Sequence, residues 1–220
     1  MMLSNRQQFD ENLRELRNVL IEMGEKVSKA IDEAVESLKT TDLELAQKVI
    51  DNDRAINELE EKIEQIGTRL IATQQPVAKD LRRIMIAFKM AGDLERMGDL
   101  AVNLAKVRLR IGTEKLLKPL VDIPRMAEIV QTMTAESIKA YIEENIDLSY
   151  KMAKMDDEVD HLHSQILREL FELMQGKPNL VNQAMLLSFV SMHLERMADH
   201  ATNIGENVVY LVSGKRPDLN

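Results

Sequence analysis

Apolar residues recur every three or four positions along almost the whole chain, and this spacing predicts amphipathic helices. In the first half, the apolar stripes cover residues 9–38, 45–70 and 77–111. Polar breaks separate them: Asp42 can cap the second helix, and Pro76 disfavours helix at the residue before it. We therefore expect three helices in this half, joined by short turns and packed antiparallel.

Residues 112–124 interrupt the helical pattern and are expected to form a linker. Three further apolar stripes follow, beginning near Asp122, near Asp147 and after Pro178. The sequence thus predicts an all-α protein of six helices, arranged as two tandem antiparallel three-helix bundles with an internal pseudo-repeat. The expected domains are residues 1–113 and 114–220.

A short repeated segment supports this duplication. Asp93–Asn103 in the third predicted helix recurs as His193–Asn203 in the sixth, one hundred positions later. Seven of the eleven paired residues are identical, which gives the shared pattern Leu-Glu-Arg-Met-x-Asp-x-Ala-x-Asn. A repeat at this spacing indicates a duplicated helical module. Most of the identical residues are polar, so the packing of a core does not by itself explain them.

The repeated segment places oxygen-bearing side chains in one column on a helix. Glu95, Asp99 and Asn103 are spaced i, i+4 and i+8, whereas Leu94 and Met97 fall on a different stripe that can face a core. Carboxylates one turn apart repel each other by a few tenths of a kcal/mol, so another interaction must favour them. The matching residues of the second copy are Glu195, Asp199 and Asn203.

The second predicted helix of each unit carries another polar column. The two sets share the spacing i, i+4 and i+7, and they are Asp53, Asn57 and Glu60 in the first unit and Asp156, Asp160 and His163 in the second. If the second and third helices of a unit pack side by side, their columns line one groove. Oxygen ligands suit Mg²⁺, Ca²⁺ or Mn²⁺. The imidazole of His163 adds a nitrogen ligand, which suits Fe or Zn as well. The alternative is that each column is a solvated helix face.

Four arginines are candidates for contacts with a partner. Arg82 and Arg83 lie near the start of the third predicted helix, and Arg96 and Arg196 lie inside the repeated segment. Each of the last two follows a glutamate, so an ion pair within the helix is the alternative. The sequence does not separate these interpretations.

Composition excludes several classes of protein. The net charge of −8 and the pI of about 5.2 argue against binding to nucleic acid. The chain has no cysteine, which excludes disulfides and thiolate metal sites. It has no transmembrane-length apolar run, and residues 1–12 do not form a signal peptide, so we expect a cytoplasmic protein.

Catalytic signatures are missing from the sequence. It contains neither a glycine-rich phosphate loop nor a Gly-x-Ser-x-Gly motif. A ferritin-like di-iron bundle needs two Glu-x-x-His motifs, and the chain has one, Glu158 with His161. We therefore expect a protein that is not an enzyme.

The duplicated motif, in two units of about 100 residues, resembles the PhoU family of phosphate-uptake regulators along nearly the whole chain. This resemblance implies a cytoplasmic negative regulator that forms a homodimer. It implies an adaptor between a phosphate-specific ABC transporter, through its ATPase subunit, and the phosphate-sensing histidine kinase.

The resemblance also implies metal at the signature acids, which are Glu95 with Asp99 and Glu195 with Asp199. The metal could be Fe, Zn, Mn or Mg. Asn57 stands where the second unit has Asp160, so the first site is expected to be weaker. Two alternatives remain: a metal-dependent phosphohydrolase or oxidase with a dinuclear site on the same columns, and a coiled-coil scaffold whose acids bind nothing.

Overall fold

The computed structural model describes residues 2–219, and their side chains from residue 7 onward. This part of the chain is all-α, as the sequence predicts, and contains no strand. The elements are α1 (Met2–Thr40), α2 (Leu43–Asn52), α3 (Arg54–Gln74), α4 (Ala78–Ile111), α5 (Asp122–Glu143), α6 (Ile146–Ala153), α7 (Asp156–Met174), the 3₁₀ turn η1 (Pro178–Leu180) and α8 (Val181–Ser213).

The middle helix of each unit is divided, which the sequence did not predict. The second predicted helix is α2 followed by α3, with a break at Asp53, and the fifth is α6 followed by α7, with a break at Lys154 and Met155. Neither break contains glycine or proline, and the apolar stripe continues across it, so the periodicity shows no interruption. Asp53 and Asp156 consequently lie at helix N-termini, where the helix dipole favours negative charge.

Other predicted boundaries are confirmed. The Asp42 side chain caps α2 by accepting a hydrogen bond from the Leu45 amide at 2.9 Å. The helix α4 ends at Ile111, and Gly112 follows with a φ of 68°, which glycine adopts without strain. The sequence did not identify Asn145 as the cap of α6, where it accepts from the Leu148 amide at 3.0 Å.

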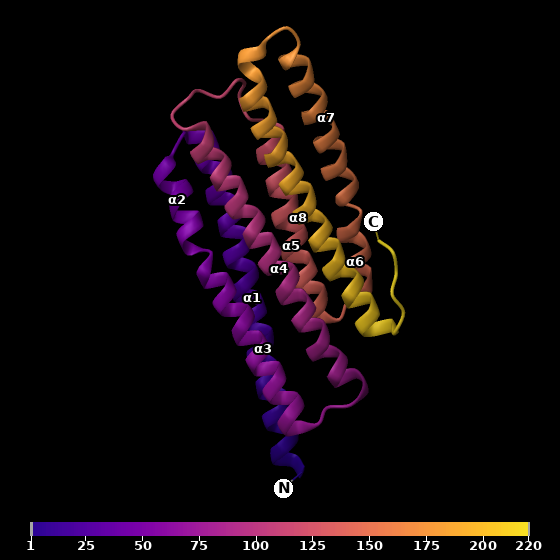
Figure 1. Ribbon diagram of the computed structural model, residues 1–220. Helices are drawn as coiled ribbons and strands as arrows, with labels where there is room; N and C mark the ends of the chain where they lie inside the picture. The colour runs from indigo at the N-terminus through magenta and orange to yellow at the C-terminus, as the bar shows by residue number, and fades with distance from the viewer. Residues whose placement is uncertain (1, 220) are drawn as a thin grey trace.

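The two units pack face to face as one elongated bundle (Figure 1). The long helices α4 and α8 run antiparallel at its centre and pack along each other, with α1 and α5 behind them. The divided helices α2–α3 and α6–α7 form the two opposite edges. Because α4 contacts α8 and α1 contacts α5, the apolar residues of both units join in one core.

The repeated segments lie in the centre of this core. Leu94 and Met97 on α4 are fully buried, as are Leu194 and Met197 on α8. The apolar stripe of the repeat therefore faces inward, as the sequence predicts. Between residues 2 and 219, no helix combines the length and the apolar character that crossing a membrane requires.

Candidate functional site

The structure brings the predicted polar columns of the first unit together. Five residues form what we call the first acidic cluster. Asp53 lies at the start of α3, Asn57 and Glu60 lie on α3, and Glu95 and Asp99 lie on α4. A β-carbon at Gly98 would lie 2.9 Å from Ile56 Cδ1 and 3.6 Å from Asp53 Oδ1. The missing side chain at Gly98 thus lets the start of α3 approach α4 closely.

Mutual repulsion and partial burial raise the pKa values of the acids in the first acidic cluster. Burial raises the pKa of Asp53, and the neighbouring charge of Asp99 raises it further. Burial also raises the pKa of Glu95, as do the charges of Asp99 and Glu60. Burial and nearby acids raise the pKa of Glu60, although Arg96 opposes the shift. These carboxylates therefore crowd one place, and the nearby charges of Arg96 and Lys106 do not offset burial and mutual repulsion.

The second unit contains a matching group. We call Asp156, Asp160 and His163 from α7 with Glu195 and Asp199 from α8 the second acidic cluster. Asp156 is buried, and burial together with the charges of Asp160, Asp199 and Glu195 raises its pKa to about 7. Burial raises the pKa of Glu195 and of Asp199, and the charge of Asp160 adds to both shifts.

The histidine of this cluster is held by α8. The Nδ1 atom of His163 lies 2.8 Å from the hydroxyl oxygen of the buried Ser191. Burial lowers the pKa of His163, against the opposing charge of Asp160, which favours the neutral ring. A neutral ring with one nitrogen bonded to a neighbour is the state in which histidine binds a metal through its other nitrogen.

The donors of both clusters fit a cation. In the first acidic cluster, Asp53 Oδ1 and Asn57 Oδ1 are buried and have no hydrogen-bond partner among the described residues. Buried oxygens in native proteins nearly always have a partner, so these two atoms are available as ligands for a cation. A bound divalent cation would neutralise the crowded carboxylates, and oxygen donors suit Mg²⁺, Ca²⁺ or Mn²⁺.

The side chains of the two acidic clusters are spread apart and are partly exposed to solvent. Across the described side chains, no three or more histidine, aspartate or glutamate residues are already gathered tightly enough to hold an ion together. Asp99 and Asp160 are exposed to solvent, and Glu95 and Asp199 are half-buried. Binding of a cation would therefore draw exposed side chains toward the buried Oδ1 atom of Asp53 or toward the buried Asp156.

The two asparagines of the repeated segment have different surroundings. Asn103 is half-buried on α4. Asn203 lines a separate cavity between α4, α8 and the segment that follows α8. The predicted roles of Asn103 and Asn203 as metal ligands both stay predictions.

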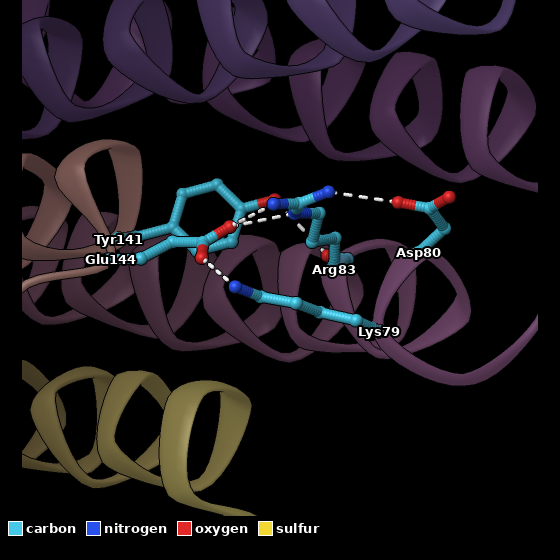
Figure 2. Close-up of polar contacts among 5 residues, drawn as sticks. All are labelled: Lys79, Asp80, Arg83, Tyr141 and Glu144. Atoms are coloured by element: carbon cyan, nitrogen blue, oxygen red, sulfur yellow. Dashed lines mark hydrogen bonds and ion pairs between the residues drawn. The ribbon is translucent and has the colours of Figure 1, made fainter. Parts of the chain in front are cut away.

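Among the four arginines, Arg83 is occupied within the chain (Figure 2). Its guanidinium binds Glu144 at 2.6 Å and Asp80 at 2.8 Å, and Lys79 binds the other oxygen of Glu144 at 2.5 Å. The hydroxyl of Tyr141 donates to the Arg83 carbonyl at 3.0 Å. This group fastens the start of α4 to the end of α5 and so joins the two units.

The other three arginines keep their predicted role as candidates for partner contact. Arg96 and Arg196 are exposed. The charge of Arg96 acts on Glu60 and Glu95, and that of Arg196 acts on Glu195 and Asp199. The Nε atom of Arg82 is buried and has no hydrogen-bond partner in the described part of the chain.

Sequence reasoning missed a polar contact between the units. His200 Nδ1 on α8 lies 3.0 Å from Asp93 Oδ1 on α4. Both residues interrupt the repeat, since Asp93 is matched by His193 and His200 is matched by Leu100. This double departure from the repeat was the signal in the sequence, although it could not show that the two residues meet.

The fold and the site define the class of protein: two similar helical units in tandem, each with one acidic cluster. The family model described as the PhoU domain matches residues 20–107 and again residues 123–208. The chain therefore belongs to the PhoU family, and the resemblance noted from the repeated motif is confirmed.

Relatives of nearly the same length support this assignment. The chain is 40% identical over 213 residues to a phosphate-specific transport system accessory protein PhoU homolog of Clostridium acetobutylicum, covering 96% of this chain and 97% of the relative. The Aquifex aeolicus homolog of that name is 42% identical over 205 residues, covering 93% of both. The crystal structure of PhoU from Pseudomonas aeruginosa superposes with a TM-score of 0.88 at 35% identity, covering 94% of this chain and all of that chain.

Proposed function

We propose that this protein is a metal-binding negative regulator of phosphate uptake and of phosphate-starvation signalling. In this proposal it acts at the cytoplasmic side of the membrane as an adaptor between a phosphate-specific ABC transporter and a phosphate-sensing histidine kinase. The names of its relatives support the link to phosphate transport, because they describe accessory proteins of a phosphate-specific transport system.

The observation that carries the proposal is the pair of acidic clusters at matching places on the two units. Each cluster combines an acid at a helix start, Asp53 or Asp156, with the Glu-x-x-x-Asp motif of the neighbouring long helix. A bound cation would tie the edge helix of a unit to its central helix. Metal occupancy would thereby set the surface that a partner protein meets.

The surroundings of the clusters favour regulation over catalysis. A metal-dependent phosphohydrolase or oxidase needs an open coordination position inside a shielded pocket. Asp99 and Asp160 are exposed instead, so each cluster is accessible to a docking protein. Arg82, Arg96 and Arg196 are the side chains that we propose for contact with the kinase or the transporter, and we propose that the protein acts as a homodimer.

Gene deletion tests the regulatory role. Deleting the gene should raise expression of phosphate-starvation genes in medium rich in phosphate, and the wild-type gene should restore repression. Complementation with Asp99→Asn/Asp199→Asn should fail if the clusters act in regulation. The matched control is Asp51→Asn/Asp147→Asn, which removes two exposed carboxylates from the same edges of the bundle, on α2 and α6, and should complement fully. Unchanged reporter expression in the deletion strain would contradict the proposal.

Co-purification tests the partners. Tagged protein should retain the transporter ATPase subunit and the histidine kinase from detergent-solubilised membranes, and Arg96→Glu/Arg196→Glu should retain less of at least one. Retention of neither protein would refute the adaptor role. Light scattering of the purified chain should give twice its mass of 25.1 kDa, and a monomer at micromolar concentration would refute the homodimer.

A further inference from the structure

A second polar cavity lies between α4, α8 and the segment that follows α8. Its volume is about 340 Å³, and it is open to solvent. The side chains that give it its character are Lys89 and Arg96 from α4, Asn203 and Asn207 from α8, and Arg216 from the C-terminal segment. A volume above roughly 300 Å³ is typical of sites for small molecules.

The positive side chains of this cavity form no close ion pair among the described residues. Among the described side chains, no ion pair within 4 Å joins Lys89, Arg96 or Arg216 to an acid. The cavity contains two carboxylates, Asp93 and Glu206, and each has another partner. Asp93 binds His200 at 3.0 Å, and Glu206 accepts from the Leu219 amide at 2.9 Å.

The C-terminal segment is held where it completes the cavity. Gly214 ends α8 with a φ of 74°, and the chain then turns back along the bundle (Figure 1). The bond between Glu206 and the Leu219 amide fastens the returning chain to α8. The Arg216 guanidinium lies 5.3 Å from the centre of the Tyr210 ring, and this cation–π contact positions it without neutralising it.

Comparison of the two repeats shows that the cavity is particular to one side of the bundle. The residues of the other repeat that match Lys89, Gly92 and Asn207 are Phe189, Met192 and Val107. On the other side of the bundle, apolar side chains therefore stand in place of the lysine, of the glycine that leaves space, and of the asparagine. Arg96 and Asn203 are matched by Arg196 and Asn103, so the other side keeps the shared polar pair but lacks the remaining polar groups.

We propose that this cavity binds a phosphoryl oxyanion, either inorganic phosphate or the phosphate group of a small ester. Guanidinium groups bind tetrahedral oxyanions through charge-assisted hydrogen bonds, and an ammonium and two carboxamides add further donors. The protein carries a net charge of −8, and this cavity gathers three cations, of which Arg96 also acts at longer range on Glu60 and Glu95. The inference does not depend on the proposed regulatory role, since it concerns binding alone.

Calorimetric titration of the full chain, stripped of metal by chelator, tests the site. Inorganic phosphate is the first probe, adenosine monophosphate is the second, and sodium chloride at equal ionic strength is the control. Wild-type protein should bind at least one of the two probes with a stoichiometry of one per chain. Tighter binding of phosphate indicates the free anion as the natural ligand, and tighter binding of the nucleotide indicates an ester.

Matched variants assign the binding to this cavity. Arg216→Gln and Gly92→Met should each weaken binding at least tenfold, the first by removing a cation and the second by filling the space as Met192 does on the other side. Arg196→Gln, which changes the matching arginine outside the cavity, should leave the affinity unchanged. Circular dichroism checks that each variant is folded, and Arg216 is exposed, so its substitution is not expected to affect folding.

Two results would overturn the inference. One is the absence of binding of either probe by wild-type protein up to millimolar concentration. The other is binding that survives both Arg216→Gln and Gly92→Met, or that falls equally in Arg196→Gln. Neither result would affect the reporter assay that tests the regulatory role, so the two proposals fail separately.

Discussion

His200 on α8 and Asp93 on α4 form a polar contact at the centre of the bundle, with His200 Nδ1 at 3.0 Å from Asp93 Oδ1. The Asp93 side chain is only 11% exposed, so water does not readily replace this partner. The contact joins the central helices of the two units, whose buried apolar residues belong to one core. It therefore couples the stability of one unit to that of the other.

Substitution of the histidine tests this coupling. We predict that His200→Leu, which introduces the residue found at the matching position 100, lowers the free energy of unfolding by about 1–3 kcal/mol, because it leaves a buried carboxylate unpaired. Urea denaturation measures the change. The double variant Asp93→Asn/His200→Leu should recover part of the loss. Strictly additive effects of the two substitutions would show that the residues do not interact.

Two glycines inside helices should respond in opposite ways to alanine. A β-carbon at Gly67 would lie 2.2 Å from Phe88 Cε1 and 2.9 Å from Ile84 Cγ2, so Gly67→Ala should destabilise the fold by about 1–3 kcal/mol. At Gly92 the nearest atom is Glu60 Oε1 at 3.7 Å, so Gly92→Ala should be neutral or stabilise by up to about 1 kcal/mol through helix propensity. Thermal denaturation of both variants checks the contrast, and equal effects would contradict the close approach of Phe88.

Asp156 should make stability depend on pH in metal-free protein. Its pKa is about 7 in the folded chain, against 3.8 for an unperturbed aspartate, so the folded state holds an extra proton between these values. The contribution of Asp156 to stability therefore falls as pH rises from 4 to 7. Asp156→Asn should be more stable than wild type at pH 8, by about 1–2 kcal/mol after allowance for solvent screening, and equal to it at pH 4.

Urea denaturation at both pH values, in the presence of chelator, measures this difference. Asp147→Asn on the exposed face of α6 is the control and should keep the pH dependence of wild type. A variant Asp156→Asn that is less stable than wild type at pH 8 would mean that the carboxylate is favourable in the empty cluster.

Glu144 should give the opposite dependence on pH. Burial alone would raise its pKa, but hydrogen bonds from Lys79 and Arg83 outweigh burial and hold the pKa below its usual value. Its contribution to stability is therefore present at neutral pH and is lost as pH falls through the folded pKa. Glu144→Gln should lower stability at pH 7 by about 1 kcal/mol and less at pH 3, and a deficit that grows on acidification would contradict the ion pairs.

The helical periodicity was sufficient to predict the all-α fold and most helix ends. Apolar stripes and polar breaks are local features, so the end of α4 at Ile111 and the cap at Asp42 could be derived from them. The breaks at Asp53 and at Met155 could not be predicted. Each is a short turn without glycine or proline, and the stripe of apolar residues continues across it. The segments on either side of each break pack against α4 or α8, and the periodicity carries no information about this packing.

The candidate site was predictable to the extent that it follows from repeats. The helical spacing put Glu95 and Asp99 in one column and Asp53 in another, and we expected the two columns to line one groove. The structure brings these acids together. The contacts of Asp93 and Arg83 join residues far apart in the sequence and depend on how the two units pack. Periodicity on single helices carries no information about that packing.

Cation binding by the two acidic clusters is the central claim, and a thermal shift on chelator-stripped protein tests it most directly. Saturating Mn²⁺, Fe²⁺ or Zn²⁺ should raise the melting temperature by about 5–10 °C at a hundredfold excess over the dissociation constant, because the ion binds only the folded chain. Asp99→Asn/Asp199→Asn should abolish most of the shift. No shift with any of these metals, or a shift that the double variant retains in full, would contradict the claim.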